Sequence, residues 1–321
     1  MAVTAVVCAA GIVLDDRVLV GSPIWFKPFK FAVSFVAYCL SLAWLLAQLP
    51  PGGRAARVGR WAGAAVAVSG LAEMVIIVGQ VVRGRRSHFN VATPFDAALF
   101  ALMGATIVVL WAATLVIAVL LLRARIADRA AALAMRAGIA LALAGAAVGY
   151  VMTQPTPGQR SGEPDVVGAH SVGVPDGGPS MPLTGWSTTG GDLRIPHFFG
   201  MHALQLLPLL VVVLLLLARR VPRLRSERVR SRLVGLASLT YAAVFALLVQ
   251  QALRGQPLLS PDATTLTETG LILAATAVGV WLILRSQSRA DQRAVLQDKA
   301  GPEPREPRTT PQTDSRTTEA S

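Results

Sequence analysis

Charged residues are scarce in this sequence: Asp, Glu, Lys and Arg make up 15% of its 321 residues. Apolar residues make up 53%, more than an ordinary soluble domain carries, and this balance predicts a membrane protein. The net charge of +12 would suit a nucleic-acid partner, but the arginines lie in pairs and clusters between apolar runs. Membrane topology explains that distribution better, so no nucleic-acid partner is predicted.

Cysteine is nearly absent: Cys8 and Cys39 are the only two, and both lie inside apolar runs. This excludes a disulfide framework and any CxxC metal or redox motif. The sequence also lacks a nucleotide-binding loop, a Gly-x-Ser-x-Gly motif, a zinc signature and a dinucleotide fingerprint, so enzymes that depend on them are unsupported. No basic residue precedes the first apolar stretch, and a cleaved signal peptide is not expected.

Long apolar runs are what the sequence does contain. A helix needs about 20 residues to cross roughly 30 Å of hydrocarbon, and seven stretches meet or approach that length. An eighth, residues 1–14, stops at Asp15 and is either a short first span or the end of a longer one. We predict an all-α polytopic transmembrane helix bundle of seven or eight spans in contact with the lipid bilayer. The seven longer stretches are 29–49, 61–82, 95–122, 137–153, 195–218, 233–253 and 264–284.

The Lys and Arg residues of the short connections predict the orientation. One alternate set of connections holds fourteen and the other eight, so the first set is placed in the cytoplasm. Residues 286–321 are rich in Pro, Thr and charge, and they are predicted to form a disordered cytoplasmic tail.

The extracytoplasmic connections are then 15–28, 83–94, 154–194 and 254–263. The third separates a first membrane region, 1–153, from a second, 195–285. It is rich in Gly and Pro but also contains His170, Trp186 and four acidic residues. A connection of this length is functional or disordered, and we expect a folded cover over the outer mouth of the bundle.

A weak internal repeat links the two membrane regions. Gln-x-x-Arg-Gly occurs at 80–84 and again at 251–255, and Pro28 and Pro196 open two spans at nearly the same offset. A shift of four spans preserves chain direction, so the pattern predicts two parallel four-span halves. The alternative is chance matching between arginine-rich span ends.

Glu73 is the most unusual residue of the spans, because ionisable groups inside a bilayer are costly unless they face a cavity or another helix. Gln80 lies two turns further along the same helical face, and Arg83 follows it. This polar stripe predicts a pocket, with a structural hydrogen-bond network between helices as the alternative.

Directly after this stripe, His88 and Asn90 lie in a connection with no capping role to explain them. Thr93 and Pro94 predict the cap and the first position of the next helix. Asp96 then lies in the first turn, where the helix dipole favours an anion.

The densest group of polar residues enters the sixth span from the outer side. His202 and Gln205 share a helical face there, and histidine is rare at that depth in a membrane, so a ligand or proton-relay role is weighed against a helix contact. Pro208 is predicted to kink the helix and open a pocket. The candidate pocket residues are Glu73, Gln80, Arg83, His88, Asn90, Asp192, Arg194, His197, His202, Gln205, Gln251 and Arg254.

Trp25-Phe-Lys-Pro-Phe-Lys-Phe31, Ser87-His-Phe-Asn90 and Gly191-Asp-Leu-Arg194 with Pro196-His-Phe198 resemble phrases of uncharacterised bacterial membrane proteins, a likeness that implies no activity. The four-plus-four layout with histidines near one face is similar in architecture to haem A synthase-like proteins. Those proteins place histidines on paired spans of both halves. Here one half has His202 and the other has only the loop residue His88. The glutamate and cysteine motifs of that family are also missing.

Three functions are considered for this predicted bacterial cytoplasmic-membrane protein, and the sequence does not decide whether it is an enzyme. The first is an extracytoplasmic pocket for a small ligand, metal or haem-like cofactor, with His88, His197 and His202 as candidate metal ligands. The second is a transporter or channel for a small solute or protons, and the third a scaffold or sensor. The first is favoured because the polar residues stop near Glu73. It predicts that Glu73, Gln80, His202 and Gln251 converge in one cavity.

Overall fold

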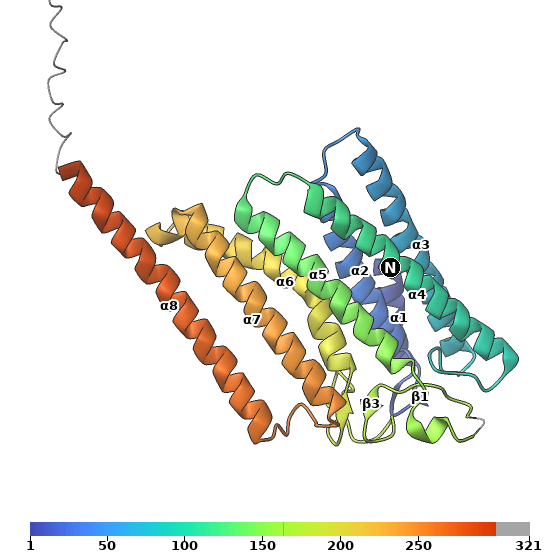
Figure 1. Cartoon of the computed structure of the whole chain (residues 1–321). Coiled ribbons are helices and arrows are strands. Elements are labelled where there is room, and N and C mark those ends of the chain that lie inside the picture. The colour runs from blue at the N-terminus through green and yellow to red at the C-terminus, as the bar shows by residue number, and fades with distance from the viewer. Residues whose placement is uncertain (163, 300–321) are drawn as a thin grey trace, which may run out of the picture.

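The computed structural model describes residues 1–162 and 164–299, with side-chain surroundings described up to residue 285. It confirms an all-α polytopic bundle (Figure 1). Seven of its helices are long and apolar enough to cross a membrane, and the first is shorter. The helices are α1 Ala2–Leu14, α2 Phe26–Leu46, α3 Arg54–Val82, α4 Pro94–Arg123, α5 Arg129–Met152, α6 Arg194–Leu217, α7 Glu227–Leu253 and α8 Ala263–Lys299.

Helices adjacent in sequence pack against one another, and the most extensive contact joins α5 to α6. Glycines permit that contact: a Cβ on Gly138 would lie 2.9 Å from the carbonyl oxygen of Ala203. At the edge of the bundle α8 packs mainly on α7 (Figure 1), and none of its apolar window is buried. Small residues let membrane helices approach closely, whereas a peripheral helix leaves its apolar surface to lipid.

Several helices begin earlier than the predicted spans, at Arg54, Arg129 and Glu227. Hydropathy reports only the part of a helix inside hydrocarbon, and arginine-bearing turns stay helical beyond it while their charged heads reach water. At the other end of the chain α8 continues to Lys299, so the prediction of disorder from residue 286 is wrong for 286–299. Residues 300–321 of the predicted tail lie outside the described residues.

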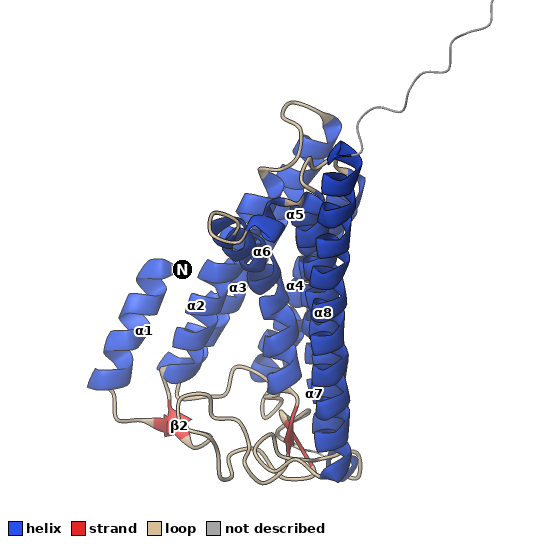
Figure 2. Ribbon diagram, turned by 90° about the vertical axis from the view of Figure 1, so that its left-hand side faces the viewer, coloured by secondary structure: helices blue, strands red, loops and turns tan. Residues whose placement is uncertain are grey.

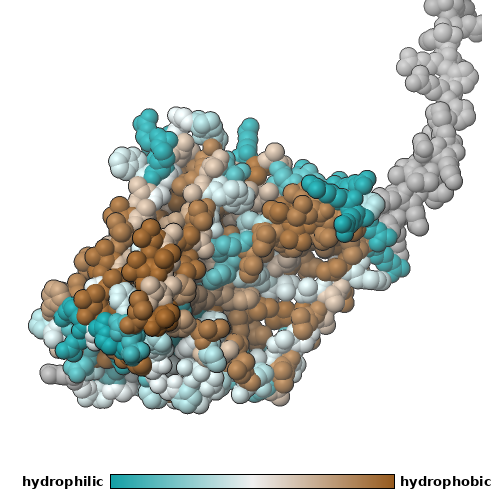
Figure 3. All heavy atoms as spheres, turned by 180° about the vertical axis from the view of Figure 1, so that it is seen from behind, coloured by the Kyte–Doolittle hydropathy of each residue, from teal (hydrophilic) through white to brown (hydrophobic). Residues whose placement is uncertain are grey.

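The interior of the bundle is apolar, with Leu45, Ile77, Ile117 and Leu121 fully buried between the first helices. Large apolar side chains also cover much of the outer surface (Figure 3), where a soluble protein would carry polar residues. A helix that is apolar on all sides is typical of a membrane span.

One end of the bundle, named the loop face here, carries two small hairpins and the long connection between α5 and α6 (Figure 2). In the first hairpin β1 Val18–Leu19 pairs with β2 Ser22–Pro23, and in the second β3 Ser171–Val172 pairs with β4 Gly191–Asp192. The long connection also contains a 3-10 turn, Pro157–Gln159. The opposite face carries the short arginine-rich connections and a second 3-10 turn, Pro222–Arg225.

The long connection is folded onto the helix ends by backbone hydrogen bonds. The amide of Val91 donates to Asp165, that of Val167 to Phe89, and that of Leu193 to His170, at 2.9 to 3.0 Å. These bonds satisfy backbone groups that would otherwise be buried without a hydrogen-bond partner. The connection thereby forms a cover over the ends of α2, α3 and α6.

Candidate functional site

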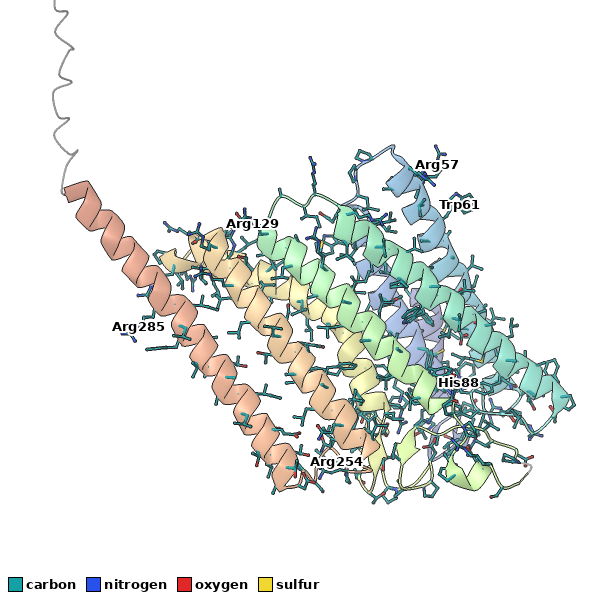
Figure 4. The ribbon with its side chains drawn as sticks, in the orientation of Figure 1. Arg57, Trp61, His88, Arg129, Arg254 and Arg285 are labelled. Atoms are coloured by element: carbon teal, nitrogen blue, oxygen red, sulfur yellow. The ribbon has the colours of Figure 1, made fainter. Side chains whose placement is uncertain are left out.

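A cavity of about 160 Å³ lies beneath this cover. Its walls come from the start of α2, the end of α3, residues 85–89 and the start of α6, and the β1–β2 hairpin and the long connection close it above. His88, at its wall, lies toward the loop face, whereas Arg57 and Arg129 lie at the opposite end of the molecule (Figure 4). A cavity of roughly 150 Å³ admits a molecule the size of benzene, so this one suits a small ligand or one chemical group of a larger molecule.

Basic side chains dominate the polar part of this cavity. Five line it, and Asp176 is the one carboxylate among the lining residues. Lys30 Nζ donates to the carbonyl oxygen of Thr184 at 3.0 Å. Three of the five cations, namely Lys27, Arg85 and Arg86, line the cavity without such a partner among the described residues. No described residue accepts a hydrogen bond from their side chains or forms an ion pair with them.

Arg194 is the best-anchored of the five cations. Its guanidinium bonds both carboxylate oxygens of Asp192, at 2.9 and 2.5 Å, and donates to the carbonyl oxygen of Gly185 at 2.6 Å. Asp192 is fully buried and also accepts from the amide of Ser187. The predicted site residues Asp192 and Arg194 therefore act together, with Asp192 holding Arg194 at the cavity wall.

The starts of α2 and α6 both reach the cavity and bring Lys27, Lys30 and Arg194 to its wall. The first amide of α6 is already bonded, because Arg194 N donates to Asp192 Oδ1 at 3.0 Å. The positive character of the cavity therefore comes from its Lys and Arg side chains.

His170 and Asp176 form a hydrogen-bonded pair at the cavity wall. Asp176 accepts from His170 Nδ1 at 2.8 Å and from the amides of His170 and Ser171 at 3.0 and 2.8 Å. Burial raises the pKa of Asp176, but these hydrogen bonds outweigh it and hold the pKa well below its usual range. Burial, assisted by nearby Arg194 and Lys27, lowers the pKa of His170 despite Asp176. The pair is therefore a carboxylate and a neutral imidazole at neutral pH.

His88 is the second imidazole of the cavity wall. Its ring lies 5.5 Å from the ring of Phe31 and 6.2 Å from that of Phe89, which in turn lies 4.9 Å from His170. Burial, Lys27 and His170 lower the pKa of His88, so it too is neutral at neutral pH. The ring of Phe89 contacts both histidines, and its backbone has a φ of 63°, a conformation uncommon for an aromatic residue.

Gln80 and Arg83 lie outside the cavity and form a network at the start of α4. Gln80 Nε2 donates to Asp96 at 2.9 Å, and Arg83 forms an ion pair with the same carboxylate at 2.6 Å. Thr93 caps α4 as predicted, because its hydroxyl accepts from the amide of Asp96. Gln80 and Arg83, the upper part of the predicted stripe, therefore form a structural hydrogen-bond network between α3 and α4, which was the alternative to a pocket.

Gln251 and Arg254 form a similar turn between α7 and α8, away from the cavity. Gln251 Nε2 donates to the carbonyl oxygen six residues later, as Gln80 does. Arg254 pairs with Asp262, which caps α8 by accepting from the amide of Thr265. Ligand contact is not needed to explain either residue.

Glu73 is completely buried one turn below Ile77, which lines the cavity floor. Its Oε1 accepts from the hydroxyl of Thr106 in α4 at 2.6 Å, whereas its Oε2 has no hydrogen-bond partner. Asn90 is also buried, and it bonds the backbone of Arg86 and Ala92. Both lie near the cavity without lining it.

The remaining predicted residues of α6 lie elsewhere. His197 Nδ1 contacts the carbonyl oxygen of Gly145, and Gln205 donates to Ser41, so both join α6 to other helices. His202 is exposed on the outside of α6 and bonds only its own helix at Phe198. The predicted convergence of Glu73, Gln80, His202 and Gln251 does not occur, because these side chains point to four different neighbours.

The three histidines proposed as metal ligands are likewise not brought together. Within the part of the chain that the structure describes, no group of three His, Cys, Asp or Glu side chains could hold a metal ion. His88 lines the cavity, His197 binds α5, and His202 faces outward. A positive cavity would also repel a metal cation.

Lys27, Lys30, Arg86, His170 and Asp176 were missed as site residues by sequence reasoning. Lysine at the end of a span usually anchors the helix at the membrane interface, so neither lysine stood out as a site residue. A signal was present: eight basic residues lie in the connections that should be poor in them. Basic residues that violate the positive-inside tendency require another explanation.

No family model, curated protein or solved structure matches the chain. The fold nevertheless defines the class: with seven helices able to span the bilayer, the chain is a multi-pass integral membrane protein.

Proposed function

We propose that this protein binds a small phosphate-like anion in the cavity at its loop face. The observation that carries the proposal is the charge of the lining. Among the described residues, Lys27, Lys30, Arg85 and Arg86 have no carboxylate partner, whereas Arg194 is paired with Asp192 and the one lining carboxylate, Asp176, is engaged by His170. Cations that line one cavity repel one another, so a bound phosphate anion relieves an unfavourable arrangement. A phosphate group has the charge and the several acceptor oxygens that Lys and Arg recognise.

We place the loop face on the extracytoplasmic side of a bacterial cytoplasmic membrane, with the C-terminal region of α8 in the cytoplasm. The supporting argument is the larger number of arginines in the connections of the opposite face. The anion would then reach the cavity from outside the cell or from the outer leaflet.

A free phosphate ester and a lipid headgroup share this chemistry. The polar walls suit either, and Phe26, Phe31 and Phe198 supply an apolar wall at the level where α2 and α6 enter the membrane. A haem-like cofactor does not fit: about 160 Å³ is small for a macrocycle, and the histidines are dispersed. Transport has weaker support, because fully buried Ile77 closes the floor.

Calorimetric titration of the purified full-length protein with inorganic phosphate tests the proposal. Lys27→Gln and Arg86→Gln should each weaken binding about tenfold or more, since a hydrogen bond to a charged group contributes about 1.5–3 kcal/mol. Arg57→Gln, on the opposite face, is the matched control and should bind as the parent protein does.

Two lipid environments distinguish the source of the anion. In nanodiscs of neutral lipid, phosphate should bind; if the natural ligand is a headgroup, phosphatidic acid in the nanodisc should abolish that titration. The proposal is wrong if neither phosphate nor phosphatidic acid binds, or if Lys27→Gln and Arg86→Gln bind as the parent does.

We also propose that the two halves, α1–α4 and α5–α8, arose by duplication. The Gln-x-x-Arg-Gly turns support this, because both end in a glycine with positive φ and both place the arginine on the aspartate at the start of the next helix. The glutamine and arginine of neither turn line the cavity described above, so the shared turn serves the fold.

A further inference from the structure

We infer that the cavity is also a reaction site, in which His170 attacks the phosphorus of a bound phosphomonoester. This inference rests on the proposed anion site. It adds an activity that anion binding alone does not require, namely phosphoryl transfer to water by way of a phosphohistidine.

The hydrogen bonds of His170 leave one ring nitrogen for chemistry. Nδ1 is held at 2.8 Å from Asp176, and the amides of His170 and Ser171 fix that carboxylate in place. Over residues 1–162 and 164–285 no partner bonds Nε2, and the side chain keeps 25% of its surface exposed at the cavity wall. A nucleophile oriented by a third group, with its reactive atom open, is the usual arrangement in covalent catalysis.

The surroundings of His170 suit attack on an anion. Arg194, Lys27 and His170 line the same cavity, so a phosphate held by these cations shares that cavity with the imidazole. The lowered pKa of His170 keeps the ring neutral and its lone pair available at neutral pH. When Nε2 forms a bond to phosphorus, the ring becomes positive, and the Asp176 carboxylate stabilises that charge.

The reaction balances without a further reactant. Nε2 of neutral His170 forms a bond to phosphorus of the phosphomonoester monoanion while the bond from phosphorus to the ester oxygen breaks. The leaving oxygen takes the proton that the phosphate monoanion carries and departs as an alcohol. Water then attacks the phosphohistidine, the N–P bond breaks, and dihydrogen phosphate and neutral His170 are released.

The reverse of the second step needs only inorganic phosphate, so the activity can be tested without knowing the alcohol. Dihydrogen phosphate and His170 give phosphohistidine and one water, which exchanges phosphate oxygens with solvent. Incubation of the full-length protein with [¹⁸O₄]phosphate in neutral-lipid nanodiscs should therefore deplete ¹⁸O, measured by ³¹P NMR. [³²P]phosphate should label the protein with an alkali-stable, acid-labile bond at His170.

His170→Asn should still bind phosphate in the titration but lose both exchange and label at least a hundredfold. Asp176→Asn should slow exchange while keeping the label on His170. His202→Asn, an exposed histidine outside the cavity, is the control and should exchange at the parent rate. If either cavity variant unfolds, oxygen exchange and ³²P labelling of the parent protein still test the inference.

Phosphate binding without exchange by the parent protein overturns the inference and leaves the anion site intact. Exchange that persists in folded His170→Asn overturns it as well. Absence of phosphate binding would instead refute the anion site on which the inference rests.

Discussion

Gly145 of α5 and Gly200 of α6 pack backbone against backbone: a Cβ on Gly145 would lie 2.7 Å from the Cα of Gly200. The contact sets the position of α6, whose first turn carries Arg194 to the cavity.

Gly145→Ala should lower the free energy of unfolding by about 1–3 kcal/mol, because the added methyl group meets backbone that cannot move aside. The melting temperature in detergent measures this effect. Gly104→Ala is the matched control, since a Cβ at that position of α4 has nothing within 4 Å. It should be neutral or slightly stabilising. Equal melting temperatures for the two variants would contradict the close packing of α5 and α6.

Thr106 supplies the one hydrogen bond of the Glu73 carboxyl group among the described residues. Thr106→Val should cost about 1–3 kcal/mol because it leaves a buried polar group without a partner. The double variant Glu73→Leu with Thr106→Val should cost less than Thr106→Val alone, as both polar groups are then gone. Melting temperatures of the three variants check this, and purely additive effects would exclude a coupled pair.

The two neutral cavity histidines make stability depend on pH. Because His88 and His170 have lowered pKa values in the folded protein, the unfolded chain binds more protons just below pH 6.5. Stability should therefore be complete above pH 6.5 and fall as the pH drops, by at most about 1.4 kcal/mol per pH unit for each histidine. His88→Gln should show a shallower loss of melting temperature between pH 6.5 and 5. An unchanged slope would mean that His88 is protonated in the folded protein.

The shared turn contrasts two aspartates with similar partners and different burial. The side chain of Asp96 is 1% exposed and that of Asp262 is 46% exposed. Asp96→Ala should cost about 1–3 kcal/mol, since Gln80 and Arg83 lose a buried acceptor. Asp262→Ala should cost less than about 1 kcal/mol, because exposed ion pairs contribute little. Thermal unfolding of both variants makes the comparison, and a larger effect at Asp262 would contradict it.

The orientation can be tested by cysteine labelling in intact cells. Ser161→Cys, exposed in the long connection, should react with a membrane-impermeant maleimide, whereas Arg57→Cys should react only after permeabilisation. The parent protein gives the background, because Cys8 is buried and Cys39 is half-buried. Labelling in the reverse order would place the cavity in the cytoplasm.

The spans could be predicted because crossing hydrocarbon imposes a length and a composition on each helix. The cap at Thr93 could be predicted because it depends on residues within one turn. The cavity could not, because Lys27 and His170 are far apart in sequence and meet only in the folded bundle.

The misplacement of His202 has a different cause. Histidine is rare at its depth, which made it a candidate, but α6 carries apolar residues on both its interior and its outer side. Hydropathy alone therefore does not show in which direction His202 points. Rarity indicates that a residue is unusual, whereas the direction of its side chain depends on which helices lie beside it.

The walls of the cavity also impose an order on its assembly. Lys27, Lys30 and Arg86 are synthesised and inserted with the first three helices, whereas His170, Asp176 and Arg194 follow only after α5. A ribosome that has completed five helices has therefore made four of the five cations of the site, but neither the long connection that covers it nor its anchored arginine. The cavity is completed when the sixth helix enters the membrane, because that helix supplies the last part of its wall.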